Sequence, residues 1–158
     1  MALSFASKTQ ELSYTKVVDY LQTSTLFENA VQFSTTQPRI NLTYGSARVA
    51  VEVLTWDVHP WEERELAIVR ASSCVTVNSH LGPELMDFLL TENQRMRFGA
   101  FHLGPQGEVL FAHSVLGGEG MDLLELQTCI LSVVTIADTY DDLIVEQFGG
   151  QRALDLGM

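Results

Sequence analysis

The side chains best suited to bind a metal ion or to act as a general base are the four histidines, His59, His80, His102 and His113. His59 and His80 fall in predicted loops without the spacing of metal ligands. His102 and His113 fall in a predicted β-hairpin. In the favoured register they point to opposite faces, and in the alternative register they lie about 13 Å apart along one face. Because zinc ligands need their nitrogens ~2.0–2.1 Å from one ion, we expect neither a metal site nor a cofactor.

Carboxylates gather near the end of the sequence, at Asp138, Asp141 and Asp142. On a helix, Asp138 and Asp142 are four positions apart, and two like charges at this spacing repel by about 0.2–0.5 kcal/mol. A cluster of this kind is usually a solvated helix face. The alternative is an acidic patch that binds a polypeptide, so we take these three residues as candidate protein-binding residues.

The sequence has no motif for nucleophilic catalysis or for phosphate binding. It contains neither GxSxG nor GxxxxGK[ST]. Cys74 and Cys129 have apolar neighbours and no basic residue close in the sequence, which indicates buried, unreactive thiols. The enzymatic alternative is a site assembled in space from the acidic helix and His102 or His113. We expect that the protein is not an enzyme.

Two tryptophans, Trp56 and Trp61, fall in a predicted loop. One interpretation is that both rings fold back onto the core. The other is an aromatic contact site, because Trp is enriched at the hot spots of protein interfaces. Trp56 and Trp61 are therefore also candidate protein-binding residues.

The chain is strongly acidic, with 9 basic and 20 acidic residues and a net charge of −11 at pH 7. Such a surface repels phosphate backbones and anionic lipids, so nucleic acid and membranes are not expected as partners. The charge favours solubility, and it also favours a basic or neutral polypeptide as a partner. We find no apolar run near the ~20 residues of a membrane span and no signal peptide, so we expect a cytoplasmic protein.

The predicted elements follow the order α-β-β-β-α-β-β-α, an α+β fold in which helices pack on an antiparallel sheet. Without repeats or a linker, we expect one domain over residues 13–150. Flexible tails are expected over residues 1–12 and 151–158. The predicted strands are 39–44, 47–55, 65–77 and the two arms of a hairpin over 97–116, and the predicted helices are 13–22, 26–32, 84–93 and 121–147.

Local signals fix several of these elements. Gly45-Ser46 suits a two-residue hairpin turn. Pro105 and Gly107 suit a three-residue turn, and that turn pairs Phe101 with Phe111. A capping box at Thr25 and Glu28 predicts the helix over 26–32. The last helix carries a wide apolar stripe, which indicates burial against a sheet or against another subunit.

The second half of the chain resembles YbjN-domain proteins of the cyanobacterial type. FLLTENQRMRFGAFHLGPQGEVLFAHSVLGG is similar to that family's helix end and glycine-containing hairpin, and LLELQTCILSVVTIADTYDDLIVEQFGGQRALD to its last helix. The resemblance covers about residues 85–155 well. The family in turn resembles the type III secretion chaperones, also called the Tir-chaperone-like fold. This implies a small, acidic α+β homodimer that holds an extended polypeptide on its surface.

We therefore expect a non-enzymatic chaperone-like or adaptor protein that binds a polypeptide client. An exposed strand edge or groove would hold the client, with Trp56 and Trp61 as aromatic anchors. The alternative is a regulatory module of the sensory-transduction type that binds a small ligand between the sheet and the helices.

Overall fold

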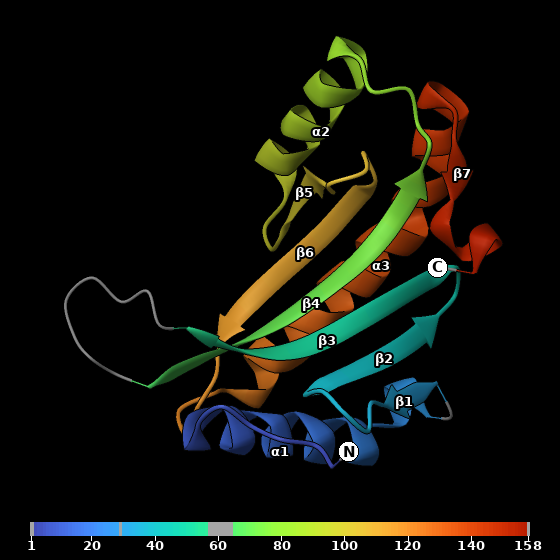
Figure 1. Ribbon diagram of the computed structural model, residues 1–158. Coiled ribbons are helices and arrows are strands. Elements are labelled where there is room, and N and C mark those ends of the chain that lie inside the picture. The colour runs from blue at the N-terminus through green and yellow to red at the C-terminus, as the bar shows by residue number, and fades with distance from the viewer. Residues whose placement is uncertain (1, 29, 57–64, 158) are drawn as a thin grey trace.

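The computed structural model describes residues 2–28, 30–56 and 65–157, which form an antiparallel sheet packed by helices (Figure 1). The predicted α+β class is confirmed. The described helices are α1 (Lys8–Thr23), α2 (Pro83–Arg95) and α3 (Leu123–Phe148), with short 3-10 helices η1 (Thr25–Phe27) and η2 (Ala153–Leu156). The described strands are β1 (Val31–Phe33), β2 (Arg39–Tyr44), β3 (Ala47–Trp56), β4 (Leu66–Val77), β5 (Ala100–Leu103), β6 (Val109–Leu116) and β7 (Gln151–Arg152).

The described strands are ordered β1-β2-β3-β4-β6-β5, and β7 pairs with one end of β4. Every pairing between them is antiparallel. Because β6 lies beside β4, the β5–β6 hairpin is turned so that β5 takes the outer position. The two strands at the ends of this order are therefore β1 and β5.

The core lies between one face of the sheet and the helices α1 and α3. In Figure 1, α3 runs behind the sheet, and its contacts are with β3, β4 and β6. The apolar side of α3 is fully buried there at Leu126, Ile130 and Val133. Each such side chain contributes about 1.5–3 kcal/mol on burial. The chain's own sheet thus covers the apolar stripe that the sequence analysis assigned to a sheet or to a second subunit.

Both hairpin predictions are confirmed. Tyr44 pairs with Ala47, which leaves Gly45 and Ser46 in the turn, and Gly45 has a φ of +57°. In the second hairpin Phe101 pairs with Phe111. Gly107 has a φ of +82° there, in the left-handed region that favours glycine.

Helix α1 begins at Lys8, five residues earlier than predicted. The hydroxyl of Ser7 accepts a hydrogen bond from the Gln10 backbone N–H, which satisfies one free amide of the first turn. The buried side chain of Gln10 also donates to the Val53 carbonyl oxygen at 2.8 Å. Residues 8–12, assigned to a flexible tail, are therefore helical and packed on the sheet.

The predicted helix over 26–32 is wrong. Only the 3-10 turn η1 forms, and its cap is Ser24 rather than Thr25. Residues 31–33 instead form β1, which pairs with β2. A short helix has few internal hydrogen bonds to offset its nucleation, whereas the edge of β2 offers ready partners. The segment after α3, assigned to a tail, contains β7, whose Gln151 pairs with Val77 of β4.

Candidate binding surface

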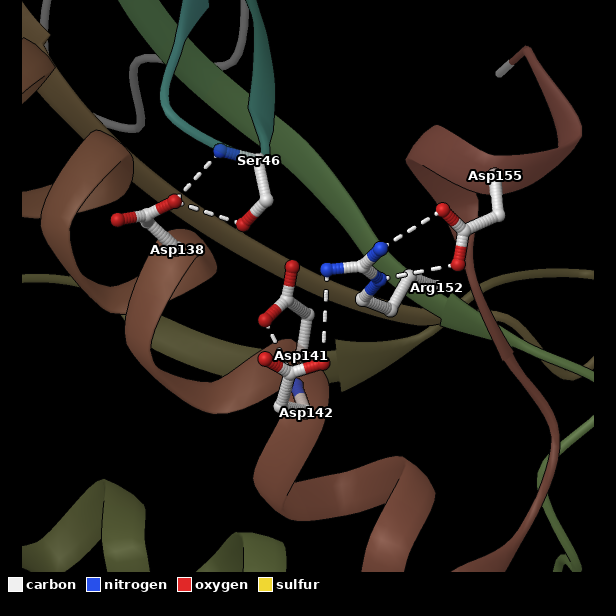
Figure 2. A network of polar contacts seen from close by, with 6 residues as sticks. All are labelled: Ser46, Asp138, Asp141, Asp142, Arg152 and Asp155. Carbon is white, nitrogen blue, oxygen red and sulfur yellow. Dashed lines mark hydrogen bonds and ion pairs between the residues drawn. The ribbon is translucent and has the colours of Figure 1, made fainter.

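The carboxylate of Asp138 holds the β2–β3 turn against α3 (Figure 2). Its Oδ1 accepts hydrogen bonds from the backbone N–H of Ser46 at 2.6 Å and from the Ser46 hydroxyl at 2.7 Å. These two bonds hold the pKa of Asp138 below its ordinary value. The position of Asp138 is explained by this structural contact within the chain.

Asp141 and Asp142 also have partners within the chain (Figure 2). Asp141 is 3% exposed, and its Oδ1 accepts from the Asp142 backbone N–H at 2.7 Å. Asp142 forms an ion pair with Arg152 at 3.5 Å, and Arg152 donates two bonds to Asp155, each 2.9 Å long. This network fastens the segment after α3 to the helix, and a protein-binding role of the three carboxylates stays a prediction.

Trp56 is the last residue of β3, where it pairs with Leu66 of β4, rather than the first residue of a loop. Its side chain is 38% exposed. Side chains alternate along a strand, so Trp56 lies on the same face of β3 as Ala50, the face opposite the core. Trp61, the other predicted anchor, lies outside the described residues.

The face of the sheet opposite α3 carries a hollow of about 670 Å³. Figure 1 looks onto this face, which we call the open face; α3 lies behind it. Short side chains form the floor of the hollow, where Ala50 on β3 and Ser72 on β4 are direct neighbours. The side chains that line the hollow include Gln32, Arg39, Asn41, Thr43, Arg48, Glu52, Arg70, Cys74, His102 and Leu110.

Arginines dominate the charge of this hollow. Arg39 forms an ion pair with Glu52 at 3.3 Å, and Glu52 is directly opposite Arg70 on β4. A guanidinium nitrogen of Arg70 lies 3.5 Å from His102 Nε2. Burial and the charge of Arg70 both lower the pKa of His102 from 6.5, so the ring is neutral at pH 7.

One end of the open face is apolar. On β3 and β4, Leu54 pairs with Ile68 and Trp56 pairs with Leu66, and Ile68 pairs in turn with Leu116 of β6. Trp56 and Leu116 are 38% and 54% exposed. We call these five residues the apolar end. An exposed apolar patch beside polar side chains is typical of a protein-interaction surface.

The two outer strands differ in how accessible their edges are. On β5, the Asn93 side chain of α2 accepts from the Phe101 N–H at 2.6 Å and donates to the Phe101 carbonyl at 3.0 Å. An incoming strand therefore finds this pair of backbone groups already bonded. On β1, Ala30 and Ser34 bond to β2, so the alternation of an antiparallel ladder turns the backbone groups of Val31 and Phe33 outward.

The histidine and cysteine side chains that could do chemistry lie apart from one another in the described part of the chain. The described residues contain no group of three His, Cys, Asp or Glu side chains placed to hold a metal ion. His102 lines the hollow, whereas the confirmed hairpin register places the side chain of His113 on the opposite face. Burial and the charge of Glu108 raise the pKa of Cys74 to about 11, so its thiol is protonated at pH 7.

Sequence reasoning missed the arginines of the open face. Alternation along the predicted strands already placed Arg48 and Glu52 on a polar face. The predicted Gly45-Ser46 turn already sets Arg39 opposite Glu52, so the missing information was the register of β4 on β3, which adds Arg70 to the same row. That register has no local signal in the sequence.

None of the described helices has both the length and the apolar character to cross a bilayer.

The comparison with protein families identifies the class of protein, whereas no curated protein matches the chain. A family model described as T3SS (YopN, CesT) and YbjN peptide-binding chaperone 1 matches residues 36–156, which include β2 to β7 and all of α3. The chain therefore belongs to this family of T3SS and YbjN peptide-binding chaperones.

Proposed function

We propose that this protein is a non-enzymatic, chaperone-like protein of the cytoplasm that holds an extended polypeptide client across its open face. The observation that carries the proposal is the hollow on the side of the sheet opposite α3. A polypeptide in extended form fits such a surface, because side chains on one side of the client enter the hollow while its backbone stays outside. The family to which the chain belongs is one of peptide-binding chaperones.

The apolar end and the hollow contact different parts of the client in this binding mode. Trp56 and Leu116 offer apolar area at one end of the face, and Trp is a frequent anchor at interfaces. The hollow offers polar side chains that fix the orientation of the client. The acidic residues Asp138, Asp141 and Asp142 are not needed as contacts, because each bonds within the chain.

A small-ligand module is the weaker alternative. It requires a pocket enclosed between the sheet and the helices, lined by convergent polar groups. The hollow instead lies on the face opposite α3, and α3 fills the other side of the sheet with apolar side chains. The position of the hollow thus favours a polypeptide over a small ligand.

The proposal is tested by filling the hollow. Ala50 lies at its floor, and Ala50→Trp places an indole where the client side chains would sit. The probe is reduced, carboxymethylated α-lactalbumin, which stays unfolded, and its affinity is measured by fluorescence anisotropy. We expect the variant to keep its circular dichroism spectrum and to bind at least about tenfold more weakly, which corresponds to about 1.4 kcal/mol.

The matched control is Leu124→Trp, which adds an indole at a position that is 70% exposed on α3. This variant should bind the probe as the unmodified protein does. Equal affinities for Ala50→Trp and Leu124→Trp would show that the client binds elsewhere and would refute the proposed location.

We also propose that the protein is a homodimer, as the resemblance in the sequence implies. Helix α2 presents Met86 and Leu90, 44% and 70% exposed, and exposed apolar side chains on one helix face are typical of interfaces. Light scattering at micromolar concentration should give twice the chain mass of 17.6 kDa. A single species at the chain mass would contradict the dimer.

A further inference from the structure

The charge of the open face is opposite to the charge of the whole chain. The chain has a net charge of −11. The described residues that line the hollow include three arginines, Arg39, Arg48 and Arg70, and one carboxylate, Glu52. The hollow is therefore a positively charged region on an acidic protein.

Within the described part of the chain, Arg70 lies in this region without an ion pair of its own. Glu52, its neighbour across the sheet on β3, forms an ion pair with Arg39 at 3.3 Å. The other polar atom near Arg70 is Nε2 of His102, whose ring is neutral at pH 7 and offers no negative charge. Among the described residues, no carboxylate forms an ion pair with Arg70. The guanidinium is thus available to pair with an anionic group of a ligand.

The charge that a ligand needs at the hollow depends on the charged side chains close to the hollow. The Debye length at physiological ionic strength is about 8 Å, so charges on the far side of the molecule are screened at the hollow. The net charge of the chain favours a basic or neutral partner, but that argument holds at long range only. At the open face itself, a bound carboxylate meets the guanidinium groups of Arg39 and Arg70.

We propose that the open face selects acidic segments of polypeptide, whose carboxylates pair with Arg70 and Arg39 while neighbouring apolar side chains pack on the apolar end. This inference rests on the proposed function and adds the chemistry of the client. Trp56 and Arg70 stand on paired strands, and Trp56 lies opposite Leu66, four residues before Arg70. Four residues of strand span about 13 Å, which an extended client also covers in four residues.

Three synthetic peptides of equal length test whether the charge of a peptide, rather than its length or extended shape, determines its affinity. Each has alternating Leu and Thr in one half, and the other half alternates Thr with Glu, Gln or Lys. Binding is measured by fluorescence anisotropy, and the site is mapped by amide chemical shifts of ¹⁵N-labelled protein. We expect the Glu peptide to bind about tenfold more tightly than the Gln peptide, and the Lys peptide to bind most weakly. Affinity for the Glu peptide should fall as salt rises.

The variant Arg70→Gln should remove most of the preference for Glu over Gln, and Arg39→Gln should reduce it in part. The matched control is Arg95→Gln on α2, which removes the same charge at a side chain that is 72% exposed and does not line the hollow. Circular dichroism checks that each variant is folded. If Arg70→Gln unfolds, the affinities of Arg39→Gln and the salt dependence of binding still test the preference for acidic peptides.

The outcomes separate this inference from the proposed function. If all three peptides shift the amides of the open face with equal affinity, the client site stands and the acidic preference is wrong. If none shifts them, the proposed function is wrong as well. A twelve-residue oligothymidylate tests the other anionic polymer, and binding as tight as that of the Glu peptide would overturn the assignment to acidic polypeptide.

Discussion

Phe101→Ala should lower the free energy of unfolding by about 3–5 kcal/mol. The Phe101 side chain is 5% exposed, and its ring centroid lies 4.9 Å from that of Phe111 and 5.2 Å from that of Tyr140. The substitution removes both aromatic contacts and leaves a cavity between β5, β6 and α3. It also loosens the place where the Asn93 amide caps the β5 edge.

Urea denaturation followed by circular dichroism measures this loss. The matched control is Leu103→Ala on the same strand, whose side chain is 38% exposed and should cost much less. A loss under about 1 kcal/mol for Phe101→Ala would contradict the packing of this hairpin on α3.

Gly150→Ala should destabilise the protein more than Gly149→Ala, although both glycines have a positive φ, +86° and +72°. A Cβ on Gly150 would overlap the Val77 carbonyl oxygen and lie 2.6 Å from the Ser79 backbone nitrogen. A Cβ on Gly149 would meet nothing within 4 Å. Both variants carry the strain of a positive φ, about 1–3 kcal/mol. Only Gly150→Ala adds the overlap, at about 1–3 kcal/mol.

The same denaturation experiment gives the difference between the two glycine variants. We expect Gly150→Ala also to release β7, which pairs with β4 directly after this glycine. Hydrogen exchange at Gln151 and Arg152 should then rise in Gly150→Ala but not in Gly149→Ala. Equal stability of the two variants would contradict the close approach of Gly150 to β4.

The parts of the fold that the sequence predicts well are those with strong local signals. The β5–β6 register follows from Gly107 and the pairing of Phe101 with Phe111. The length of α3 follows from its apolar period, with Asp122 as the cap that accepts from Leu124 and Glu125. In each case neighbouring residues alone determine the geometry.

The elements that the sequence did not reveal depend on distant partners. The strand β1 forms because the edge of β2 offers backbone partners, which bond to Ala30 and Ser34 on either side of it. The early start of α1 is stabilised by Gln10, whose side chain bonds to Val53 on β3. No local pattern around residue 10 indicates that bond, because it joins residues far apart in the sequence.

For the candidate site, too, the sequence shows individual residues but not the distant partners that surround them. The acidic cluster was visible in the sequence, but the partners Ser46 and Arg152 that explain Asp138 and Asp142 come from other parts of the chain. The sequence left open whether Trp56 packs on the core or forms a contact site, and its neighbours Leu66, Ile68 and Leu116 come together only through strand order. The binding role of Trp56 stays a prediction.

The location of the client is tested most directly by amide chemical-shift mapping of the ¹⁵N-labelled protein with the Glu peptide. The account predicts that the largest shifts cluster on the open face, around Ala50, Ser72 and Arg70, and extend to Trp56. Leu90 on α2 and Leu124 on α3, both 70% exposed, should not shift. Shifts confined to the outer surfaces of α2 and α3, or to the β1 edge at Val31 and Phe33, would contradict binding on the open face.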